Sequence, residues 1–380
     1  MDRRTFVVSA TLGTLNVGLV GLPLGWALPD DAKTLKVDVH APETPVSPLG
    51  MPGLFPGRAV EVHHPRPIVD GRVSQPAVRA MVDAGMTSLT GDSAAKDAWA
   101  KFFVPSDIVA LKVNPSGVPG TTTSMALVRE VVRALNDVGV PNKNMILYDR
   151  NSPQLEVNGY HALVPPGVRV FGLDRLGGYD LDVFCEMDCF GERETRSYLA
   201  TLVSREVTKI INLPCLKEHN ASGVTGCLKN LAYGSFDNVA RTHAKTKTWT
   251  DPAIAVMCTA PPLRSKSVLH IMDGLRAVYH SGPFAWNPDF HWDAGTLLIG
   301  TDPVAVDRIE LEIVEQKRKE RGVPSLWDRS PQHIGTRAEM ERTALKNPFY
   351  REPGHIKTAG ELGLGKWELS QIDHRRVKVG

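Results

Sequence analysis

The hydrophobic pattern of the chain alternates between short apolar runs and longer segments with helical spacing. Residues 108–113 form a run rich in β-branched residues, which predicts a buried strand, and residues 145–148 predict another. Between them, residues 124–138 repeat apolar side chains at helical spacing and stop at Gly139. A strand, a helix and a second strand in this order predict a right-handed crossover and a parallel pair of strands.

The same pattern continues toward the C-terminus. Further strands are predicted at residues 168–171, 207–213, 268–272 and 296–299. Short amphipathic helices are predicted near residues 78–86 and 94–103, and a longer one runs to about residue 321, with Asp302 as its N-cap and Pro303 in its first turn. We therefore expect an α/β fold: a mostly parallel Rossmann-like sheet with flanking helices and irregular N- and C-terminal extensions.

Composition shifts divide the chain into four parts. Residues 1–28 are expected to be an export signal, and the Pro- and Gly-rich residues 29–57 a linker. Residues 58–326 carry the strand and helix pattern, which fits one body or two lobes. Residues 327–380 are polar and interrupted by Pro and Gly, which predicts a surface-wrapping tail.

The N-terminus suggests a destination. Asp2-Arg3-Arg4-Thr5-Phe6 precedes a mildly hydrophobic run over residues 7–27, a pattern that resembles a twin-arginine export signal. An ordinary secretory signal or a retained membrane anchor are the alternatives, and the polar and glycine positions of the run disfavour the anchor. We expect an exported protein, periplasmic or extracellular, with no stable membrane insertion after signal cleavage near Leu28.

Composition and charge narrow the class of partner. The chain of 380 residues is 42% hydrophobic and 23% charged, with a net charge of +2. This balance gives no electrostatic sign of nucleic-acid binding, so we expect a small ligand or a protein partner. Five cysteines are an odd set for an exported protein, and they form no Cys-x-x-Cys motif that would predict an iron–sulfur module or a zinc ribbon. Structural cysteine is the expectation for all five, with a metal role most open for Cys215 and Cys227.

Potential chemistry is densest in residues 211–230. This segment holds two lysines, one histidine, three asparagines, two cysteines and two glycines. After the strand at 207–213 we predict a polar loop containing Gly223, and then a helix that begins near Thr225 and Gly226. A helix N-terminus behind a glycine-containing loop is a plausible anion site, because its free N–H groups and its dipole point at the ligand.

Polar residues also follow the other predicted strands. In open α/β sheets, ligands bind beyond the carboxyl ends of the strands, so these residues are expected to converge. Lys112 lies inside an apolar strand, which is costly unless its ammonium meets a carboxylate, and Asp149 or Asp273 is the expected partner. Asp302 is sufficiently explained as a helix cap. His291 and Asp293 can share one face of a strand, but the sequence shows no third ligand, so no metal site is predicted.

Several of these segments together resemble a known family. The chain contains Val109-Ala-Leu-Lys-Val-Asn114, Asn212-Leu-Pro-Cys-Leu-Lys-Glu-His219, Gly223-Val-Thr-Gly-Cys-Leu-Lys-Asn230, Asp273-Gly274 and Gly300-Thr-Asp-Pro-Val-Ala-Val-Asp307. Over roughly residues 50–314 it resembles the domain-of-unknown-function 362 family. Members often carry a twin-arginine signal, and some carry ferredoxin-type cysteine motifs, which this chain lacks. The resemblance supports the fold and the position of the site and implies no particular reaction.

The sequence thus favours an exported enzyme that binds a small anionic substrate at the carboxyl ends of its strands. The expected catalytic residues are His219, Lys217 and Lys112. The expected ligand-binding residues are Asn114, Asp149, Asn151, Thr225, Gly226, Lys229, Asn230 and Asp273. The alternatives are a non-catalytic ligand- or cofactor-binding or assembly protein, and a metal or redox protein that uses Cys215, Cys227 and His219. The cofactor, the reaction and the oligomeric state are left open.

Overall fold

The computed structural model describes residues 4–7, 36–45, 47–117 and 120–380. The predicted export signal, apart from residues 4–7, and the first part of the predicted linker lie outside the described residues.

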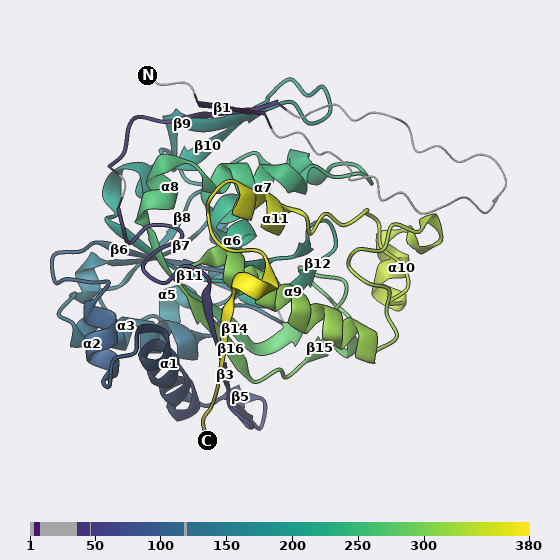
Figure 1. The fold of residues 1–380 in the computed structure, drawn as a ribbon. Coiled ribbons are helices and arrows are strands. Elements are labelled where there is room, and N and C mark those ends of the chain that lie inside the picture. The colour runs from purple at the N-terminus through teal and green to yellow at the C-terminus, as the bar shows by residue number, and fades with distance from the viewer. Residues whose placement is uncertain (1–3, 8–35, 46, 118–119) are drawn as a thin grey trace.

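The centre of the molecule is a large mixed sheet in the order β17-β3-β16-β14-β11-β6-β7-β8 (Figure 1). The five strands from β14 to β8 run parallel, and β16 is antiparallel to both of its neighbours. The strands are β3 (Arg58–His63), β6 (Val109–Val113), β7 (Met145–Asp149), β8 (Arg169–Gly172), β11 (Lys209–Leu213), β14 (Ser267–Val278), β16 (Thr296–Gly300) and β17 (Asp373–Lys378). The predicted α/β class with a mostly parallel sheet is confirmed.

Helices cover both faces of this sheet, and alternate strand residues enter the two cores. Val109, Leu111 and Val113 of β6 pack with one group of helices, whereas Ala110 packs with the other. The first group is α1 (Gln75–Thr90), α2 (Ala95–Ala100) and α3 (Met125–Asp137); the second includes α6 (Gly226–Ser235), α7 (Thr250–Cys258), α9 (Pro303–Glu320) and α11 (His355–Glu361) (Figure 1). Burial on both faces explains why the parallel strands read as continuous apolar runs.

The remaining elements are short. The other helices are α4 (Ser152–Val157), α5 (Tyr160–Leu163), α8 (Pro261–Lys266) and α10 (Arg337–Arg342). Helical turns of other types are η1 (Asn142–Asn144), η2 (Leu202–Glu206), η3 (Val239–His243), η4 (Pro288–Phe290), η5 (Pro331–His333) and η6 (Leu369–Gln371). A separate antiparallel sheet joins β1 (Arg4–Val7), β2 (Lys36–His40), β9 (Tyr179–Met187) and β10 (Arg196–Ala200), and β4 (Ile68–Val69) pairs with β5 (Arg72–Val73). No helix within the described ranges combines the length and the apolar character needed to cross a bilayer.

The segment after Pro214 corrects one prediction. Instead of a polar loop, β12 (Cys215–His219) pairs with β14 and turns back into β13 (Gly223–Val224), while β15 (His291–Trp292) pairs with β14 nearby. Lys217, Glu218 and His219 are buried in this strand. The sequence pattern did not indicate this strand, because several of its side chains are charged. Strand preference mainly reflects packing context, and here the charged groups are paired with buried partners.

The predicted convergence of polar strand ends also needs correction. Since β16 is antiparallel to β14, its end lies at the opposite edge of the sheet, and so does Asp302. Asp302 caps α9: its Oδ1 accepts a hydrogen bond from the N–H of Ala305 at 2.9 Å, and its Oδ2 accepts from Gly57 and Lys366. The predicted cap role is therefore confirmed, and Asp302 takes no part in the site.

The residues after Trp327, for which the sequence predicts a surface-wrapping tail, contribute to the fold. α11 packs on α7 and α9, and β17 adds a parallel edge strand beside β3. In the segment that joins α10 to α11, Arg351 forms a buried ion pair with Glu218 of β12. The C-terminal segment therefore helps to enclose the region around β12.

Candidate functional site

Lys112 lies on β6, fully buried, and its ammonium group is completely occupied. Nζ donates to Oδ2 of Asp149 at 2.5 Å, to the carbonyl of Val113 at 2.6 Å and to Oδ1 of Asn230 at 3.1 Å. Burial lowers the pKa of Lys112, and the Asp149 carboxylate opposes this shift. The prediction that a carboxylate neutralises Lys112 is confirmed, with Asp149 as the partner. Gly234 of α6 makes room, because a Cβ there would lie 1.9 Å from Cε of Lys112.

Lys217 on β12 is held in the same way. Its Nζ donates to Oδ1 of Asn114 at 2.8 Å and to the carbonyls of Ser116 and Thr121. Asn114 in turn donates to Oδ1 of Asn230 at 3.0 Å, and Asn230 donates to Asn212 at 2.8 Å. Burial lowers the pKa of Lys217. Lys112 and Lys217 thus cross-link the ends of neighbouring strands and α6. All N–H donors of their ammonium groups bind acceptors of the protein, so none is left for a ligand.

The N-terminus of α6 is filled by a carboxylate from the same chain. The N–H groups of Cys227 and Leu228 donate to the two carboxylate oxygens of Asp307 on α9, the latter at 2.9 Å. Gly226 has a φ of 58°, and a Cβ there would lie 2.5 Å from Cγ of Asp307. The proposed anion site at Thr225 and Gly226 is therefore not supported, because Asp307 already satisfies the helix terminus.

Two carboxylates next to this terminus carry unusual proton affinities. Burial raises the pKa of Asp307 to about 7 and raises that of Glu310 well above its ordinary value, and the charge of Asp307 adds to the shift of Glu310. Glu310 Oε1 accepts the backbone N–H of Lys217 at 3.0 Å. These residues fasten α9 to β12 and α6.

Two other predicted ligand-binding residues hold helix N-termini: Asn151 is the N-cap of α4, and Asp273 binds Ser124, the N-cap residue of α3. Oδ1 of Asn151 accepts the N–H of Gln154 at 3.2 Å and begins α4. Asp273 lies inside β14, which continues to Val278, and its Oδ2 accepts the N–H of Ser124 at 2.8 Å at the start of α3. Burial raises the pKa of Asp273. Both side chains position elements, and neither forms a hydrogen bond or ion pair with Lys112 or Lys217.

Lys229 on α6 differs from Lys112 and Lys217. It is half-buried, and its Nζ lies 4.7 Å from the ring centre of Tyr233. Within the described part of the chain, its Nζ has no hydrogen-bond acceptor and no carboxylate in ion-pair range. Burial, with the charges of Lys217, Arg150 and Lys112, lowers the pKa of Lys229 to about 7.

Arg150 supplies a second unpaired cation. It directly follows β7, beside the Lys112–Asp149 pair, and is half-buried. Its guanidinium has no acceptor among the residues that the structure describes, and its charge lowers the pKa values of Lys112, Lys229 and His243. The sequence places Arg150 after a predicted strand but gives no sign that it would stay unpaired.

Three histidines complete the surroundings of Lys229. The Nδ1 of His219 accepts the N–H groups of Ala221 at 3.1 Å and Ser222 at 3.3 Å, so the ring is neutral with its proton on Nε2. Burial, with the charges of Lys229 and His243, holds the pKa of His219 well below its ordinary value. This ring can donate a hydrogen bond from Nε2, but it is a weak general base.

His243 has the opposite tautomer. Its Nδ1 donates to the carbonyl of Ala240 at 2.7 Å, which leaves Nε2 as an acceptor, and its ring lies 6.0 Å from that of His219. Burial and the charge of Lys229 lower its pKa to about 4. His355 on α11 is buried, with an unpartnered Nε2, and burial lowers its pKa to about 4 as well. The sequence missed both residues, because only the folded chain brings η3 and α11 next to α6.

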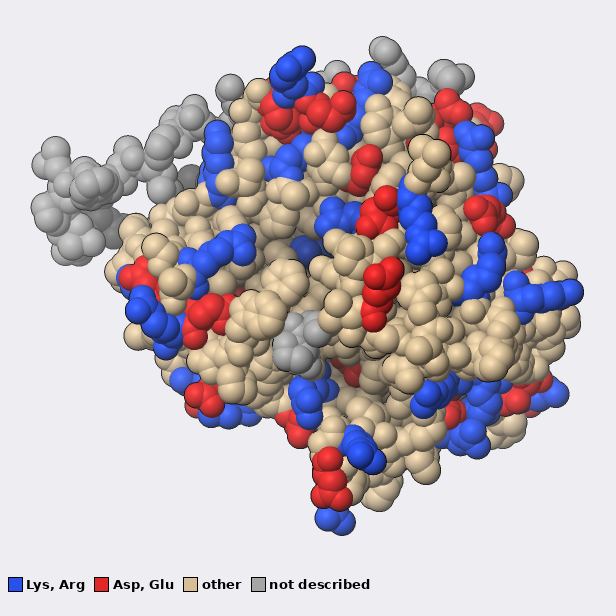
Figure 2. All heavy atoms as spheres, turned by 180° about the vertical axis from the view of Figure 1, so that it is seen from behind, with Lys and Arg blue, Asp and Glu red and all other residues tan. Residues whose placement is uncertain are grey.

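We call Lys229, Arg150, His219, His243 and His355 the cationic cluster. Its groups come from α6, the end of β7, β12, η3 and α11. Electrostatic coupling links Lys229 to each of the other four residues. The face opposite to that in Figure 1 is hollowed near its centre, and lysine or arginine atoms lie at the bottom of the hollow (Figure 2). Lys229 and Arg150, the two cations of the cluster, have no compensating carboxylate among the described residues and therefore attract anions.

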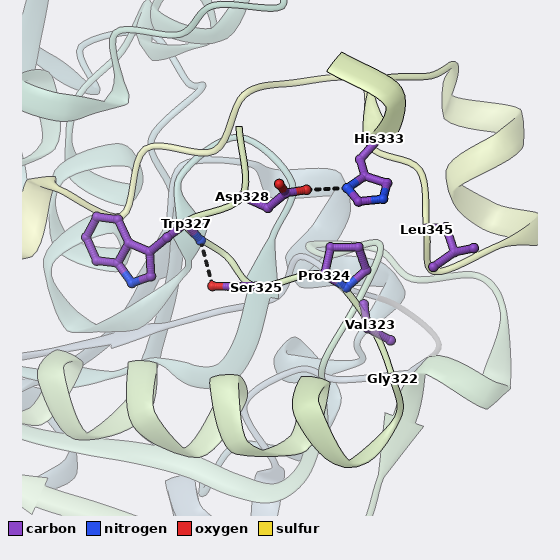
Figure 3. A pocket seen from close by; sticks show the side chains of 8 residues that line it. All are labelled: Gly322, Val323, Pro324, Ser325, Trp327, Asp328, His333 and Leu345. Carbon is purple, nitrogen blue, oxygen red and sulfur yellow. Dashed lines mark hydrogen bonds and ion pairs between the residues drawn. The ribbon is translucent and has the colours of Figure 1, made fainter. Parts of the chain in front are cut away.

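Two surface cavities lie elsewhere. One of about 610 Å³ is lined by residues of the 322–345 region, where Asp328 and His333 point toward one another and form an ion pair (Figure 3). The other, of about 450 Å³, includes His291 and Asp293. His291 contacts Thr121 and the carbonyl of Ala285, and Asp293 pairs with Arg276. Neither cavity contains a member of the cationic cluster.

The metal alternative finds no ligand set in the described ranges. No group of three or more His, Cys, Asp or Glu side chains there is placed to hold a metal ion. All five cysteines are buried free thiols, in agreement with the structural role that the sequence predicts. Burial raises the pKa of Cys215 to about 12, which makes its thiolate scarce at neutral pH.

The fold and the site define an α/β protein with a mostly parallel sheet and a cationic cluster beyond the carboxyl end of β7. The family described as "Domain of unknown function (DUF362)" matches residues 109–312, more than half of the sequence. The chain belongs to this family, as the sequence motifs indicated. No curated protein matches the sequence.

The chain has a remote likeness to solved structures. One of them is the crystal structure of a Thermotoga maritima protein, with 9% sequence identity and a TM-score of 0.37. The match covers 70% of this chain and 64% of that one, so this chain spans less than two thirds of its length.

Proposed function

We propose that the protein is an enzyme that binds a small anionic substrate between Lys229 and Arg150. One observation carries the proposal: both cations are half-buried, and neither has a carboxylate or other acceptor among the described residues. The position also fits the rule for open α/β sheets, since Arg150 lies directly beyond the carboxyl end of β7.

The pairing of the neighbouring charges supports this proposal. Lys112 is neutralised by Asp149, and Arg351 by Glu218. A recessed cation without a partner is unfavourable, because it loses hydration and gains no hydrogen bond in return. An anion that accepts hydrogen bonds from the guanidinium and the ammonium compensates for the lost hydration and supplies the missing hydrogen bonds. These are charge-assisted hydrogen bonds, which are the stronger kind. The excess of positive charge therefore favours an anionic ligand over a neutral one.

The histidines favour catalysis over simple storage of the anion. His219 offers an N–H donor and His243 offers an unprotonated nitrogen, and the two rings lie 6.0 Å apart. A donor and an acceptor on neighbouring rings suit proton transfer to and from a bound substrate. In this arrangement His243 is the better candidate for the base, and His219 for the hydrogen-bond donor. Lys112 and Lys217 act as positioning residues.

Ligand binding tests the proposal. Wild-type protein is titrated with sulfate, phosphate and pyruvate by calorimetry at pH 6.5, together with Arg150→Gln and Lys229→Gln. We expect saturable binding that weakens by about tenfold or more in each variant, since a charged hydrogen bond contributes about 1.5–3 kcal/mol. Lys143→Gln is the matched control, because Lys143 is exposed just before the other end of β7. Equal affinity in all four proteins would overturn the proposal.

We also propose that the protein is exported through the twin-arginine pathway. The Arg3-Arg4 motif and the hydrophobic run that follows it support this proposal. Cell fractionation of wild type and of the Arg3→Lys/Arg4→Lys variant tests it. Retention of only the variant in the cytoplasm is the expected result, and the same distribution for both proteins contradicts it.

A further inference from the structure

Lys229 has the surroundings of a nucleophile as well as those of an anion-binding group. The ammonium groups of the buried Lys112 and Lys217 donate their hydrogen bonds to acceptors within the protein. The amine of Lys229 has no such acceptor in the described structure and lies over the face of Tyr233 at 4.7 Å. Its lone pair and its protons are therefore available to a bound molecule.

We propose that Lys229 forms an imine with the carbonyl carbon of a substrate that also carries a carboxylate or phosphate group, which Arg150 holds. This inference rests on the proposed anion site and adds the chemical class of the substrate. Arg150 fixes the anionic end, so that the carbonyl at the other end can meet Nζ of Lys229. A bidentate guanidinium suits either anionic group.

The step balances without an oxidant or a cofactor. The neutral amine attacks the carbonyl carbon, the C–O π bond breaks, and one amine proton moves to the oxygen to give a carbinolamine. The hydroxyl then leaves as water after receiving a proton, and the C=N bond of a protonated imine remains. Starting from the ammonium form, one carbonyl compound is consumed, one water is released and the positive charge stays on nitrogen. His243 can take up a proton at Nε2, and His219 can donate a hydrogen bond to the oxygen.

The electrostatics keep a usable fraction of the amine unprotonated. Like charges and burial lower the pKa of Lys229 to about 7, and this is one of the recognised ways in which a lysine becomes a nucleophile. Charged or titratable groups from several elements interact electrostatically with Lys229. These are Lys112 of β6, Asp149 of β7, Arg150, Lys217 and His219 of β12, His243 of η3 and His355 of α11.

Borohydride trapping tests the imine. Full-length protein is incubated at pH 8 with pyruvate or, separately, with dihydroxyacetone phosphate, then reduced and analysed by peptide mass spectrometry. With pyruvate, we expect Lys229 to gain the mass of one pyruvate less one oxygen atom. Lys229→Arg keeps the positive charge and should still bind sulfate but lose the adduct. Lys245→Arg, which changes an exposed lysine, should be modified at Lys229 as wild type is.

The outcomes separate the two claims. An adduct with pyruvate alone assigns a carboxylate-bearing substrate, and an adduct with dihydroxyacetone phosphate alone assigns a phosphate-bearing one. Saturable sulfate binding without any adduct at Lys229 overturns the imine and leaves the anion site intact. Absence of sulfate binding overturns the anion site itself. Equal modification of Lys229 and of exposed lysines shows non-selective chemistry and also overturns the imine.

Discussion

Lysines in this protein have two different roles that burial alone does not distinguish. Lys112 and Lys217 are fully buried and saturated with acceptors, whereas Lys229 is half-buried and has none in the described ranges. The sequence predicted a carboxylate partner for Lys112, either Asp149 or Asp273, because a lysine in an apolar strand needs one, and the structure selects Asp149. It did not predict that the remaining cation would be Lys229, since the absence of a partner depends on the whole surrounding fold.

Replacing Lys229 with methionine should stabilise the protein at low pH. The pKa of Lys229 is lowered from 10.5 to about 7 in the folded state, so the folded chain binds fewer protons than the unfolded chain between these values. The ammonium therefore costs stability below pH 7, and this cost disappears as the pH rises toward 10.5. We expect Lys229→Met to be more stable than wild type at pH 6 by roughly 1–2 kcal/mol, less than the full shift implies because water screens a half-buried group.

Urea unfolding at pH 6 and at pH 9.5 measures this difference. The gain should shrink at the higher pH, where wild-type Lys229 is neutral in the folded state. Lys143→Met removes an exposed lysine outside the cluster and serves as the control; its stability at pH 6 should stay close to that of wild type. A Lys229→Met variant that is less stable than wild type at pH 6 would contradict this account of the ammonium.

At the scale of elements, the sequence predicted features that depend on local patterns, but it did not predict pairings between distant segments. The strand at 109–113, the helix at 125–137 and the cap of α9 by Asp302 follow from periodicity and capping within a few residues. β12 was missed because its lysine, glutamate and histidine look like loop residues until Asn114, Arg351 and the backbone of Ala221 are brought to them. The filling of the α6 terminus by Asp307 likewise joins segments about eighty residues apart.

The close approach of α6 to α9 gives a prediction at this scale. Gly226→Ala should destabilise the protein by about 2–4 kcal/mol, since it combines a positive φ with a Cβ that would lie 2.5 Å from Asp307. Gly91→Ala is a matched control: Gly91 also has a positive φ, at 82°, but an added Cβ meets nothing within 4 Å. We expect that variant to cost about 1 kcal/mol. Chemical denaturation measures both values, and equal losses would mean that the contact with Asp307 is unimportant.

At the scale of the whole molecule, the class of fold was predictable and the contribution of the C-terminal segment was not. The sequence predicts a mostly parallel α/β sheet because short apolar strand patterns alternate with helix patterns along the chain. The residues after Trp327 lack that pattern, yet they bring Arg351 to Glu218 and His355 to the cationic cluster. Polar side chains that are buried in pairs leave no periodic signal in the sequence.

The ion pair between the C-terminal segment and β12 should therefore matter for stability and for binding. Arg351→Met leaves Glu218 buried without its charged partner, which we expect to cost about 3–5 kcal/mol in unfolding free energy. Sulfate affinity should fall as well, because Glu218 lies between Lys217 and His219. Arg376→Met is the control: Arg376 lies on the exposed edge strand β17 and pairs with Glu61 of β3, and its loss should cost less than about 0.5 kcal/mol. Similar losses in both variants would show that the C-terminal segment is only a surface tail.

The central claim, that a recessed anion site is built around Lys229, is tested most directly by the pH dependence of sulfate binding. Sulfate keeps its charge across the neutral range, and the histidines of the cluster are already neutral there, so Lys229, with its pKa of about 7, is the member of the cluster whose charge changes. We predict that wild-type affinity falls by about tenfold between pH 6 and pH 8.5, in line with the loss of one charged hydrogen bond. Lys229→Arg, which stays charged, should bind equally well at both values. A wild-type affinity that does not change with pH, or the same decline in Lys229→Arg, would contradict the claim.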